Sequence, residues 1–259
     1  RVIALLIAIP FLAAGFVVPI EYAPLTMMLG LMIFMVGAVQ YHVMQGQRGQ
    51  FMAQFLSPQV AELVRSQGLK QAMQQNYMQI SVVCADLRGF TAVTEATAPD
   101  RVLRILREYY QMVGDVVADF GGTVKDQAGD GVLILVGAPI AVPDHAERAL
   151  VMARHLRQRS HELKRRWASE GLELGLGIGV ASGPVTVGVI GGSTSRLEYT
   201  AVGAAVNLAA RLCQQAADGE ILVDGSTHDA VLQETREACV PREPLMLKGF
   251  ALQVRHYAG

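Results

Sequence analysis

Two aspartates, 44 positions apart, are of the type and spacing that could bind divalent cations together. Asp86 follows a predicted buried strand over residues 79–85, and Asp130 lies in the Gly129-Asp130-Gly131 turn between two further predicted strands. In a strand-helix-strand-strand order these two tips are neighbours, so we expect the carboxylates to converge. An aspartate that occurs alone in a turn usually only stabilises that turn by hydrogen bonds to the backbone. Together they have the oxygen ligands that Mg²⁺ or Mn²⁺ requires.

A short glycine-containing segment directly after Asp86 could bind phosphate. Gly89, Phe90 and Thr91 stand where the predicted strand gives way to a helix. The first backbone N–H groups of a helix have no partner within the helix and attract anions. The sequence therefore predicts a phosphate-binding turn beside the two carboxylates.

A second pair of polar residues lies near the C-terminus, on a helix predicted over residues 204–215. Asn207 and Arg211 are four positions apart and so project from the same face of this helix. Each alone would be an ordinary surface amide or charge. Their pairing favours a joint task in one site.

The elements that must position these residues alternate between strand and helix patterns. The two long helices are predicted over residues 98–119 and 145–169, the latter with Asp144 as its N-cap and with His145, His155 and His161 on its surface. Strands are predicted over residues 79–85, 122–126, 132–136, 172–181, 185–190, 220–223 and 252–257. The order is β-α-β-β-α-β with additions, which predicts an α+β, ferredoxin-like sandwich.

Five collinear blocks resemble the class III nucleotidyl cyclases, and most closely the membrane-anchored bacterial adenylyl type. The blocks are VCADLRGFTAVTE (83–95), GGTVKDQAGDGVLILVGAP (121–139), DHAERAL (144–150), GIGVASGPVTVGVIG (177–191) and EYTAVGAAVNLAARL (198–212). They cover a predicted catalytic domain over residues 78–259. Five blocks in the right order are far more specific than any single motif.

The resemblance implies a role for each candidate residue. Asp86 and Asp130 would bind two Mg²⁺ or Mn²⁺ ions per site, assisted by the carbonyl of Leu87. Lys248, in the LKG sequence, would contact the triphosphate. The implied activity is adenylate cyclase, in which the ribose 3′-hydroxyl of ATP attacks the α-phosphate, pyrophosphate leaves and cyclic AMP forms.

The resemblance also implies a homodimer with shared active sites. The metal-binding aspartates would come from one chain, while Asn207 would orient the ribose and Arg211 would stabilise the α-phosphate from the partner chain. A head-to-tail pair of identical chains then forms two sites, and membrane anchoring raises the effective concentration of the partners.

The base-selecting positions depart from the adenylyl pattern. Thr200 fits the adenylyl type, but four residues before Asp130 stands Asp126, and the expected lysine is Lys125, one position earlier. In a regular strand Lys125 would point to the opposite face, although a bulge could redirect it. An acidic residue here resembles the guanylyl cyclases. GTP therefore stays open as the substrate, as does a weak or degenerate enzyme.

Residues 1–44 contain two apolar runs, Val2 to Ile20 and Pro24 to Met44, each long enough to cross a membrane. Pro19 and Pro24 flank the short connection between them, which suits a transmembrane hairpin. The positive-inside rule then places the remainder in the cytoplasm, at a plasma or inner membrane. A signal peptide or a buried pair of core helices is the alternative. The chain begins with Arg1, so we expect a piece of a longer protein.

Residues 45–77 form a polar, glutamine-rich segment with apolar residues at roughly helical spacing. Ser57-Pro58 is a helix-start signal with Glu62 shortly after it. We interpret this segment as a linker helix that pairs with its copy in a dimer. A solvated spacer is the alternative, because two heptads do not establish a coiled coil.

The overall composition excludes several classes. The chain has 259 residues, 51% of them hydrophobic, with 22 basic and 23 acidic residues and a net charge of −1, so nucleic acid is not an expected partner. Cys84, Cys213 and Cys239 fit neither a disulfide scaffold nor a zinc site and favour a reducing compartment. Two rivals to an enzyme are a non-catalytic nucleotide-binding module and a structural anchor or dimerisation module.

Overall fold

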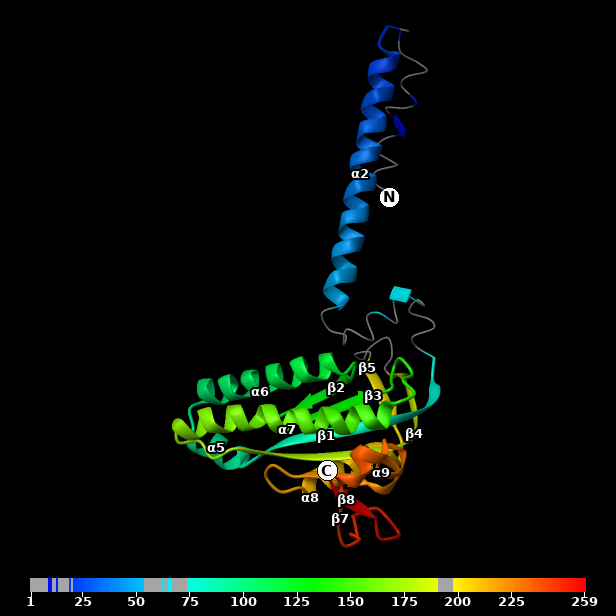
Figure 1. Cartoon of the computed structure of the whole chain (residues 1–259). Helices are drawn as coiled ribbons and strands as arrows, with labels where there is room; N and C mark the ends of the chain where they lie inside the picture. The colour runs from blue at the N-terminus through cyan, green and yellow to red at the C-terminus, as the bar shows by residue number, and fades with distance from the viewer. Residues whose placement is uncertain are drawn as a thin grey trace. The chain divides into compact units, whose positions relative to one another are not determined.

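The computed structural model describes residues 21–53, 74–190 and 198–259, together with positions 9, 10, 13, 19, 62, 65 and 66. In the first range, side chains are described for residues 21–40. The chain divides into two compact units, Arg1–Leu56 and Ser57–Gly259, which are described separately below. Figure 1 shows both units.

The described part of the first unit is mainly one long helix, α2 (Ala23–Ala53). A turn precedes it, in which the Tyr22 amide donates to the Pro19 carbonyl at 2.9 Å. Its window Ala23–Gln40 has a mean hydropathy of 1.8, and only 6% of that window is buried. By length and composition, α2 is the one helix among the described residues that could cross a membrane.

α2 contains the whole of the second predicted span and then continues into the polar segment predicted as a linker. The helix therefore does not end at residue 44, where the first domain was predicted to end. The first predicted span and the Ser57-Pro58 helix start lie outside the described residues, apart from positions 9, 10, 13 and 19. The hairpin and the pairing helix stay predictions.

The second unit is built on a mixed sheet of eight strands. Along the sheet the order is β2-β3-β1-β4-β6-β8-β7, and β5 pairs with β4. The strands are β1 (Asn76–Arg88), β2 (Thr123–Ala128), β3 (Gly131–Val136), β4 (Gly175–Ile190), β5 (Glu198–Val202), β6 (Ile221–Asp224), β7 (Val240–Pro241) and β8 (His256–Ala258). The first four strands have the antiparallel order β2-β3-β1-β4 of a ferredoxin-like core, as the sequence predicts.

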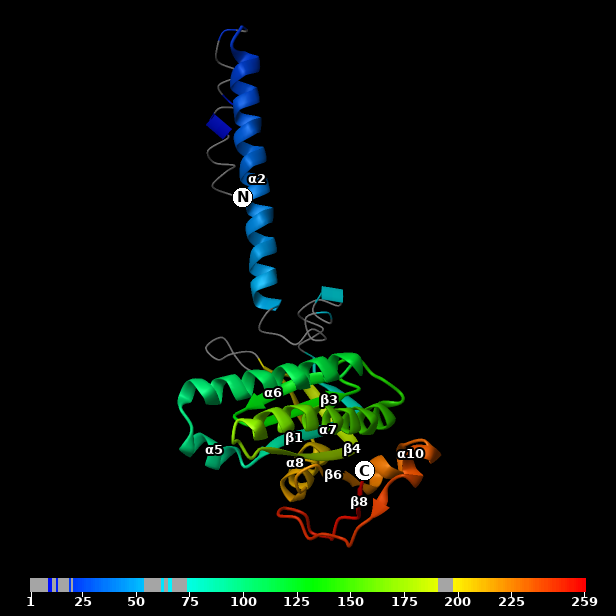
Figure 2. The same cartoon turned by 60° about the vertical axis from the view of Figure 1, so that its left-hand side comes forward.

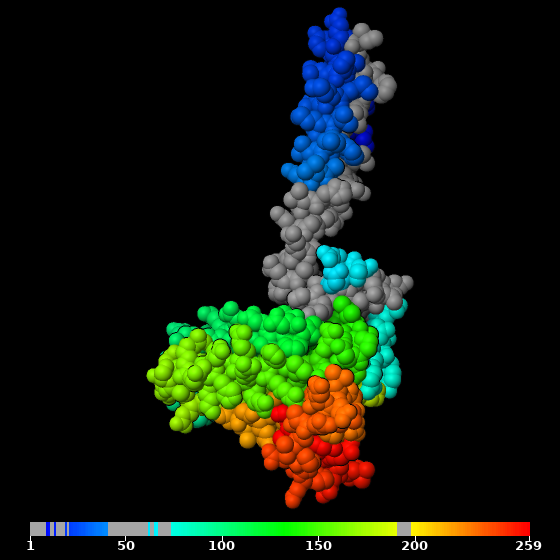
Figure 3. Space-filling view, viewed as in Figure 1, coloured from blue at the N-terminus to red at the C-terminus, as the bar shows by residue number. Residues whose placement is uncertain are grey.

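Helices cover both faces of this sheet (Figures 1 and 2). α6 (Pro99–Asp119) and α7 (His145–Ser169) pack on one face, and in the space-filling view they form one continuous outer surface (Figure 3). α8 (Ala204–Gln215) packs on the opposite face. Three short helices complete the unit: α5 (Phe90–Ala96), α9 (Gly225–Ala230) and α10 (Gln233–Glu237).

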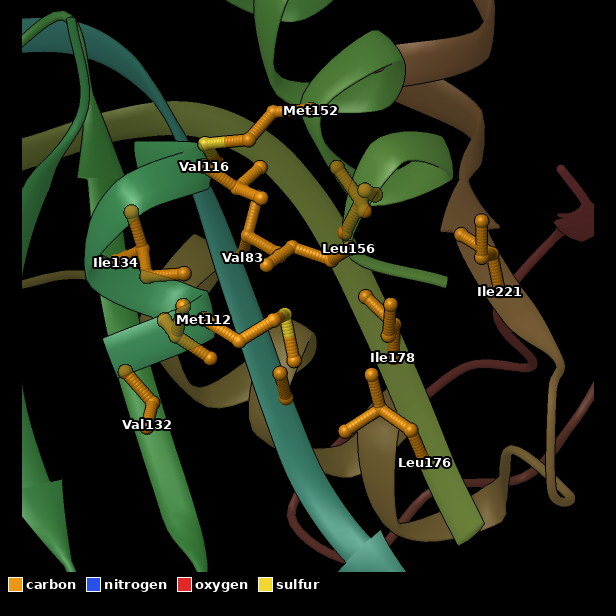
Figure 4. Packing of buried hydrophobic residues seen from close by; sticks show 14 of the residues in the cluster. Val83, Met112, Val116, Val132, Ile134, Met152, Leu156, Leu176, Ile178 and Ile221 are labelled. Atoms are coloured by element: carbon orange, nitrogen blue, oxygen red, sulfur yellow. The ribbon is translucent and has the colours of Figure 1, made fainter. Parts of the chain in front are cut away.

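The main core lies between the sheet and the α6–α7 layer. Strand β1 contributes Val83, and α7 contributes Met152 and Leu156, which are fully buried (Figure 4). α6 adds Met112 and Val116 from its inward stripe. Burying such apolar side chains, at roughly 25 cal/mol per Å² of apolar surface, holds the helices on the sheet.

One prediction about the sheet was wrong. Residues 175–190 form a single strand and not two strands separated at Ser182-Gly183-Pro184. β6 pairs with β4 only over Ile178–Val180, and β5 pairs with it only from Thr186 onward. On its other side β4 pairs with β1, where Pro184 lies opposite Gln79. Two residues earlier, the Ser182 amide points away from β1 to Asp224 of β6. The position of the missing N–H of Pro184 therefore faces the gap between β6 and β5, where no described strand needs it.

One prediction about the start of α7 is confirmed and one needs correction. Asp144 is the N-cap residue, although its side chain makes no capping hydrogen bond and instead accepts one from Arg148 at 2.9 Å. The prediction that His145 lies on the surface was wrong. Its side chain is buried, and its Nδ1 lies 2.8 Å from the Ser81 hydroxyl. Burial lowers the pKa of His145, which favours its neutral form.

Candidate functional site

Asp86 and Asp130 lie side by side at one end of the sheet, where β1 finishes and β3 begins. Asp86 stands near the end of β1, opposite Gly131 of β3, and Asp130 occupies the turn just before Gly131. The Leu87 amide donates to the Asp130 carbonyl at 3.2 Å, which fixes the turn against the strand. The structure thus brings the two carboxylates together, as their spacing predicts.

The electrostatics of Asp86 reflect this crowding. Burial raises the pKa of Asp86, and the neighbouring charge of Asp130 raises it further, while Arg88 opposes both effects. Arg88 Nη1 donates to Asp86 Oδ2 at 2.6 Å. Two partly buried carboxylates that repel each other are relieved by a cation placed between them.

These donors fit a hard divalent cation that is also held by substrate phosphates. Two carboxylates and the nearby Leu87 carbonyl are oxygen ligands of the kind that Mg²⁺ prefers. Among the described residues, no group of three or more His, Cys, Asp and Glu side chains forms a complete metal cage. A Mg²⁺ site that completes its shell with phosphate oxygens and water needs only one or two carboxylates.

The turn after Asp86 has the predicted helix start. Gly89 adopts a positive φ of 80°, and α5 begins at Phe90. A Cβ atom on Gly89 would lie 2.5 Å from the Glu173 carbonyl oxygen, so only glycine fits there. Thr91 is exposed, whereas the Phe90 side chain packs in the core and leaves only its backbone for a ligand.

Asn207 and Arg211 project from α8 away from the sheet. The inward face of α8 consists of Ala205, Ala209 and Leu212, which are buried. Asn207 is exposed, and half-buried Arg211 donates to Gln214 Oε1 at 2.8 Å. Both candidate side chains are therefore presented outward, on the same side of the helix.

Lys248 lies in an exposed turn between the bridge-forming residues Leu245 and Val254. The preceding Leu247 is buried in a small cluster with Leu212 of α8. This packing places the Lys248 turn beside the helix that carries Asn207 and Arg211.

At the base-selecting positions β2 is not a regular strand but contains a bulge, the alternative that could redirect Lys125. Val124 pairs with Ile134 and Asp126 with Leu133, so Lys125 is the extra residue in β2. The Lys125 side chain is only 12% exposed, and its Nζ lies 2.8 Å from Glu198 Oε1. Burial lowers the pKa of Lys125, but the hydrogen bond to Glu198 and the charge of Asp126 outweigh this effect and raise the pKa overall. Lys125 is therefore a cation here.

Lys125, Asp126 and β5 come together at this bulge. Asp126 Oδ2 is 3.6 Å from Lys125 Nζ, and its side chain is 53% exposed. Thr200 lies two residues after Glu198 on β5, on the same face of the strand. The three predicted base-selecting residues are thus joined by a fourth, Glu198, which the sequence pattern alone does not single out.

Two further residues, Arg88 and Tyr110, contact the region around Asp86 and Asp130 but were not predicted as site residues. Tyr110 on α6 donates a hydrogen bond to the Gly129 carbonyl in the turn that carries Asp130. Arg88 follows Asp86 by two positions on β1, and this spacing places both side chains on the same face. That spacing is a signal by which Arg88 could have been found.

Comparisons with known proteins agree with this arrangement. The model of a family described as the adenylate and guanylate cyclase catalytic domain matches residues 72–258. Adenylate cyclase 1 of Rhizobium meliloti is 33% identical over 135 residues, which are 52% of this chain and 20% of that protein. The chain spans less than half the length of these curated relatives that it matches.

Solved structures show the same fold. The adenylyl cyclase CyaB from P. aeruginosa is 28% identical, with a TM-score of 0.66 over 71% of this chain and 95% of that one. The guanylyl cyclase Cya2 is 31% identical, with a TM-score of 0.66 over 72% of this chain and 93% of that one. Proteins named for either nucleotide therefore resemble this chain to a similar degree.

Proposed function

Because the chain belongs to the class III adenylyl and guanylyl cyclase family, we propose that it converts ATP to 3′,5′-cyclic AMP and pyrophosphate at sites shared between two identical chains. The observation that carries this proposal is the paired carboxylates of Asp86 and Asp130 at one edge of the sheet. Neither a scaffold nor a dimerisation module needs two repelling carboxylates held in this way.

In this proposal, Asp86, Asp130 and the Leu87 carbonyl hold two Mg²⁺ or Mn²⁺ ions. When bound, such ions neutralise phosphate charge and lower the pKa of the attacking ribose 3′-hydroxyl. The backbone at Gly89–Thr91 and the Lys248 ammonium bind and orient the phosphates, because both present donors to anions.

The outward direction of Asn207 and Arg211 supports a site completed by a second chain. Both side chains point away from the sheet of their own chain, where a partner's nucleotide would meet them. Asn207 would orient the ribose by hydrogen bonds, and Arg211 would stabilise the charge that develops on the α-phosphate. One monomer then carries two half-sites and no complete one.

The cation at the bulge favours ATP. Lys125, held by Glu198, offers a donor, and the Thr200 hydroxyl either donates or accepts, which together suit the N1 and N6 edge of adenine. Guanylate cyclase is the second candidate, favoured by the exposed Asp126 carboxylate, an acceptor for the N1 and N2 donors of guanine. The likeness to Cya2, named a guanylyl cyclase, also supports it.

We further propose that α2 anchors the enzyme in a membrane with the catalytic domain in the cytoplasm. Apolar side chains such as Leu25, Met28 and Leu31 are more than half exposed along this helix, which disfavours a buried core hairpin. Lipid would bury that surface. The helix continues beyond the apolar stretch to Ala53, which suits transmission of a signal toward the second unit.

The test is product identification by mass. The full chain receives ATP or GTP with Mn²⁺ or Mg²⁺, and Asp86→Asn serves as the matched inactive control. Cyclic AMP as the main product supports the proposal, and cyclic GMP supports the second candidate. Nucleotide binding without either product would make the non-catalytic module the better explanation.

A further inference from the structure

Arg88 connects the candidate metal-binding carboxylate to the end of α8. Its Nη1 donates to Asp86 Oδ2 at 2.6 Å, its Nε donates to the Ala216 carbonyl at 3.0 Å, and its Nη2 donates to the Cys213 carbonyl. The last carbonyls of a helix lack partners within the helix, so a cation there is stabilised by hydrogen bonds and by the helix dipole. One planar guanidinium thus joins β1 to α8.

Two glycines of β4 leave room for the Arg88 side chain and for the close approach of α8. Gly177, the register partner of Asp86, lies under the guanidinium, and a Cβ atom there would overlap it. At Gly179 a Cβ atom would overlap the α8 backbone at Ala209 and Cys213. The helix therefore rests directly on β4, and Arg88, whose side chain is 26% exposed, fixes the position of its C-terminal end.

We infer that Arg88 is a positioning residue that sets the place of α8, and through it the place of Asn207 and Arg211. This inference rests on the proposed function. In a dimer with shared sites, Asp86 of one chain serves one site and α8 of the same chain serves the other. Arg88 therefore links the metal-binding half of one site to the ribose- and phosphate-binding half of the second site.

The consequence for the reaction follows from the geometry. A displacement of about 1 Å in a group that contacts the transition state costs about 100-fold in rate. Loss of the bonds to Ala216 and Cys213 frees the C-terminal turn of α8, one helical turn beyond Arg211. We expect a lower turnover number and an unchanged metal requirement at the site that uses this α8.

Mixed dimers of the full chain separate this role from a local effect on Asp86. An Asp130→Asn chain keeps a working α8, and an Arg211→Ala chain keeps a working metal half, so their mixed dimer has one complete site. Arg88→Met is then placed in the Asp130→Asn chain, whose metal half is not used. We expect kcat of the remaining site to fall about 10-fold or more, with the half-saturating metal concentration unchanged.

A second readout needs neither metal nor substrate. In the metal-free full chain, hydrogen exchange of the amides at residues 213–217 should be faster in Arg88→Met than in the wild type. Arg101→Met is the matched control, since Arg101 also bonds a backbone carbonyl and a carboxylate, both of Glu170, but away from α8. Arg88→Lys retains the charge without the planar fork, so it should also lower kcat while keeping the melting temperature.

Two results would overturn the inference in distinguishable ways. If the mixed dimer is active and Arg88→Met in the Asp130→Asn chain changes neither kcat nor exchange at α8, Arg88 acts only on its own Asp86. If the unmodified mixed dimer is inactive while the wild type is active, the sites are not shared, and the proposed function fails together with the inference.

Discussion

At the scale of single residues, the carboxylate of Asp86 is held in an arrangement that costs stability. Burial and the charge of Asp130 both raise the pKa of Asp86, and the Arg88 guanidinium offsets only part of this effect. Such an arrangement disfavours the ionised form at neutral pH in the absence of a cation. Perturbed carboxylates that converge at one edge of a sheet are typical of functional sites.

Asp86→Asn should therefore raise the thermal stability of the metal-free protein while abolishing activity. A carboxyl group whose pKa is raised on folding stabilises the native state while it is protonated, and that contribution is lost as pH rises from the unfolded-state pKa through the folded-state pKa. The asparagine variant does not undergo this loss. Melting temperatures measured with a chelator between pH 4 and pH 7 provide the check.

Exposed Asp115 on α6 offers the matched control, because Asp115→Asn removes a surface charge that is not among those acting on Asp86. The control should leave both activity and the pH dependence of melting unchanged. A destabilised Asp86→Asn protein would contradict the view that the two carboxylates repel each other at the cost of stability.

The bulge residues should control the choice of base. If Lys125 donates to adenine, Lys125→Met lowers kcat/KM for ATP by about 10–100-fold, roughly 1–3 kcal/mol, with little effect on GTP. Asp126→Asn, which removes an exposed carboxylate beside it, should change the ATP value little. Steady-state measurement of kcat/KM with ATP and with GTP, for both variants, tests this prediction. A larger loss with Asp126→Asn than with Lys125→Met would instead assign base selection to Asp126.

At the scale of elements, local patterns predicted most of the helices and the order of the core strands. The predicted helices over residues 145–169 and 204–215 have the observed bounds, since both carry clear apolar periodicity. The division of β4 at Pro184 was wrong because proline tolerance depends on which neighbours a strand has. The short elements β5, α9, α10 and β7 were missed because their sequences are too short to show a helical or strand period.

The candidate site was predictable where chain order fixes proximity. Asp86 and Asp130 had to meet in a β-α-β-β order, and Asn207 and Arg211 had to share a helix face. The contacts of Arg88 with α8 and of Lys125 with Glu198 depend on tertiary packing between distant segments. Contacts between distant segments cannot be predicted from a local sequence pattern.

The turn that opens α5 gives a test at this scale. Gly89→Ala combines a positive φ with a Cβ atom 2.5 Å from the Glu173 carbonyl, whereas Gly171→Ala has a positive φ and open space. We expect a loss of about 1 kcal/mol for Gly171→Ala from backbone strain alone. We expect about 2–4 kcal/mol for Gly89→Ala. Urea unfolding provides the values, and equal losses would show that the carbonyl moves aside without cost.

At the scale of the whole molecule, the apolar helix α2 leads us to expect the protein in the membrane fraction of cells and not in the soluble fraction. The full chain should stay with membranes after alkaline carbonate washing and be released by detergent. Leu31→Arg, at the centre of the apolar window, should weaken insertion, since an arginine there costs about 2.5–3.5 kcal/mol. Gln40→Arg, at the end of the window, is the matched control. Release of the wild-type chain by carbonate would contradict the anchor.

In the proposed dimer, activity is a property of two chains. Asp86 and Asp130 lie at one edge of the sheet, while Asn207 and Arg211 point away from the sheet on α8. Each inactive half-site variant should therefore be rescued by the variant that lacks the other half.

The most direct measurement mixes full-length Asp130→Asn and Arg211→Ala chains, each inactive alone, and assays cyclic AMP formation from ATP by mass. Equal mixing should restore about a quarter of the wild-type activity, because half of the dimers are mixed and each has one complete site of two. Two variants that change the same half-site, Asp86→Asn and Asp130→Asn, should not rescue each other. Failure of the first mixture to make cyclic AMP would contradict shared active sites.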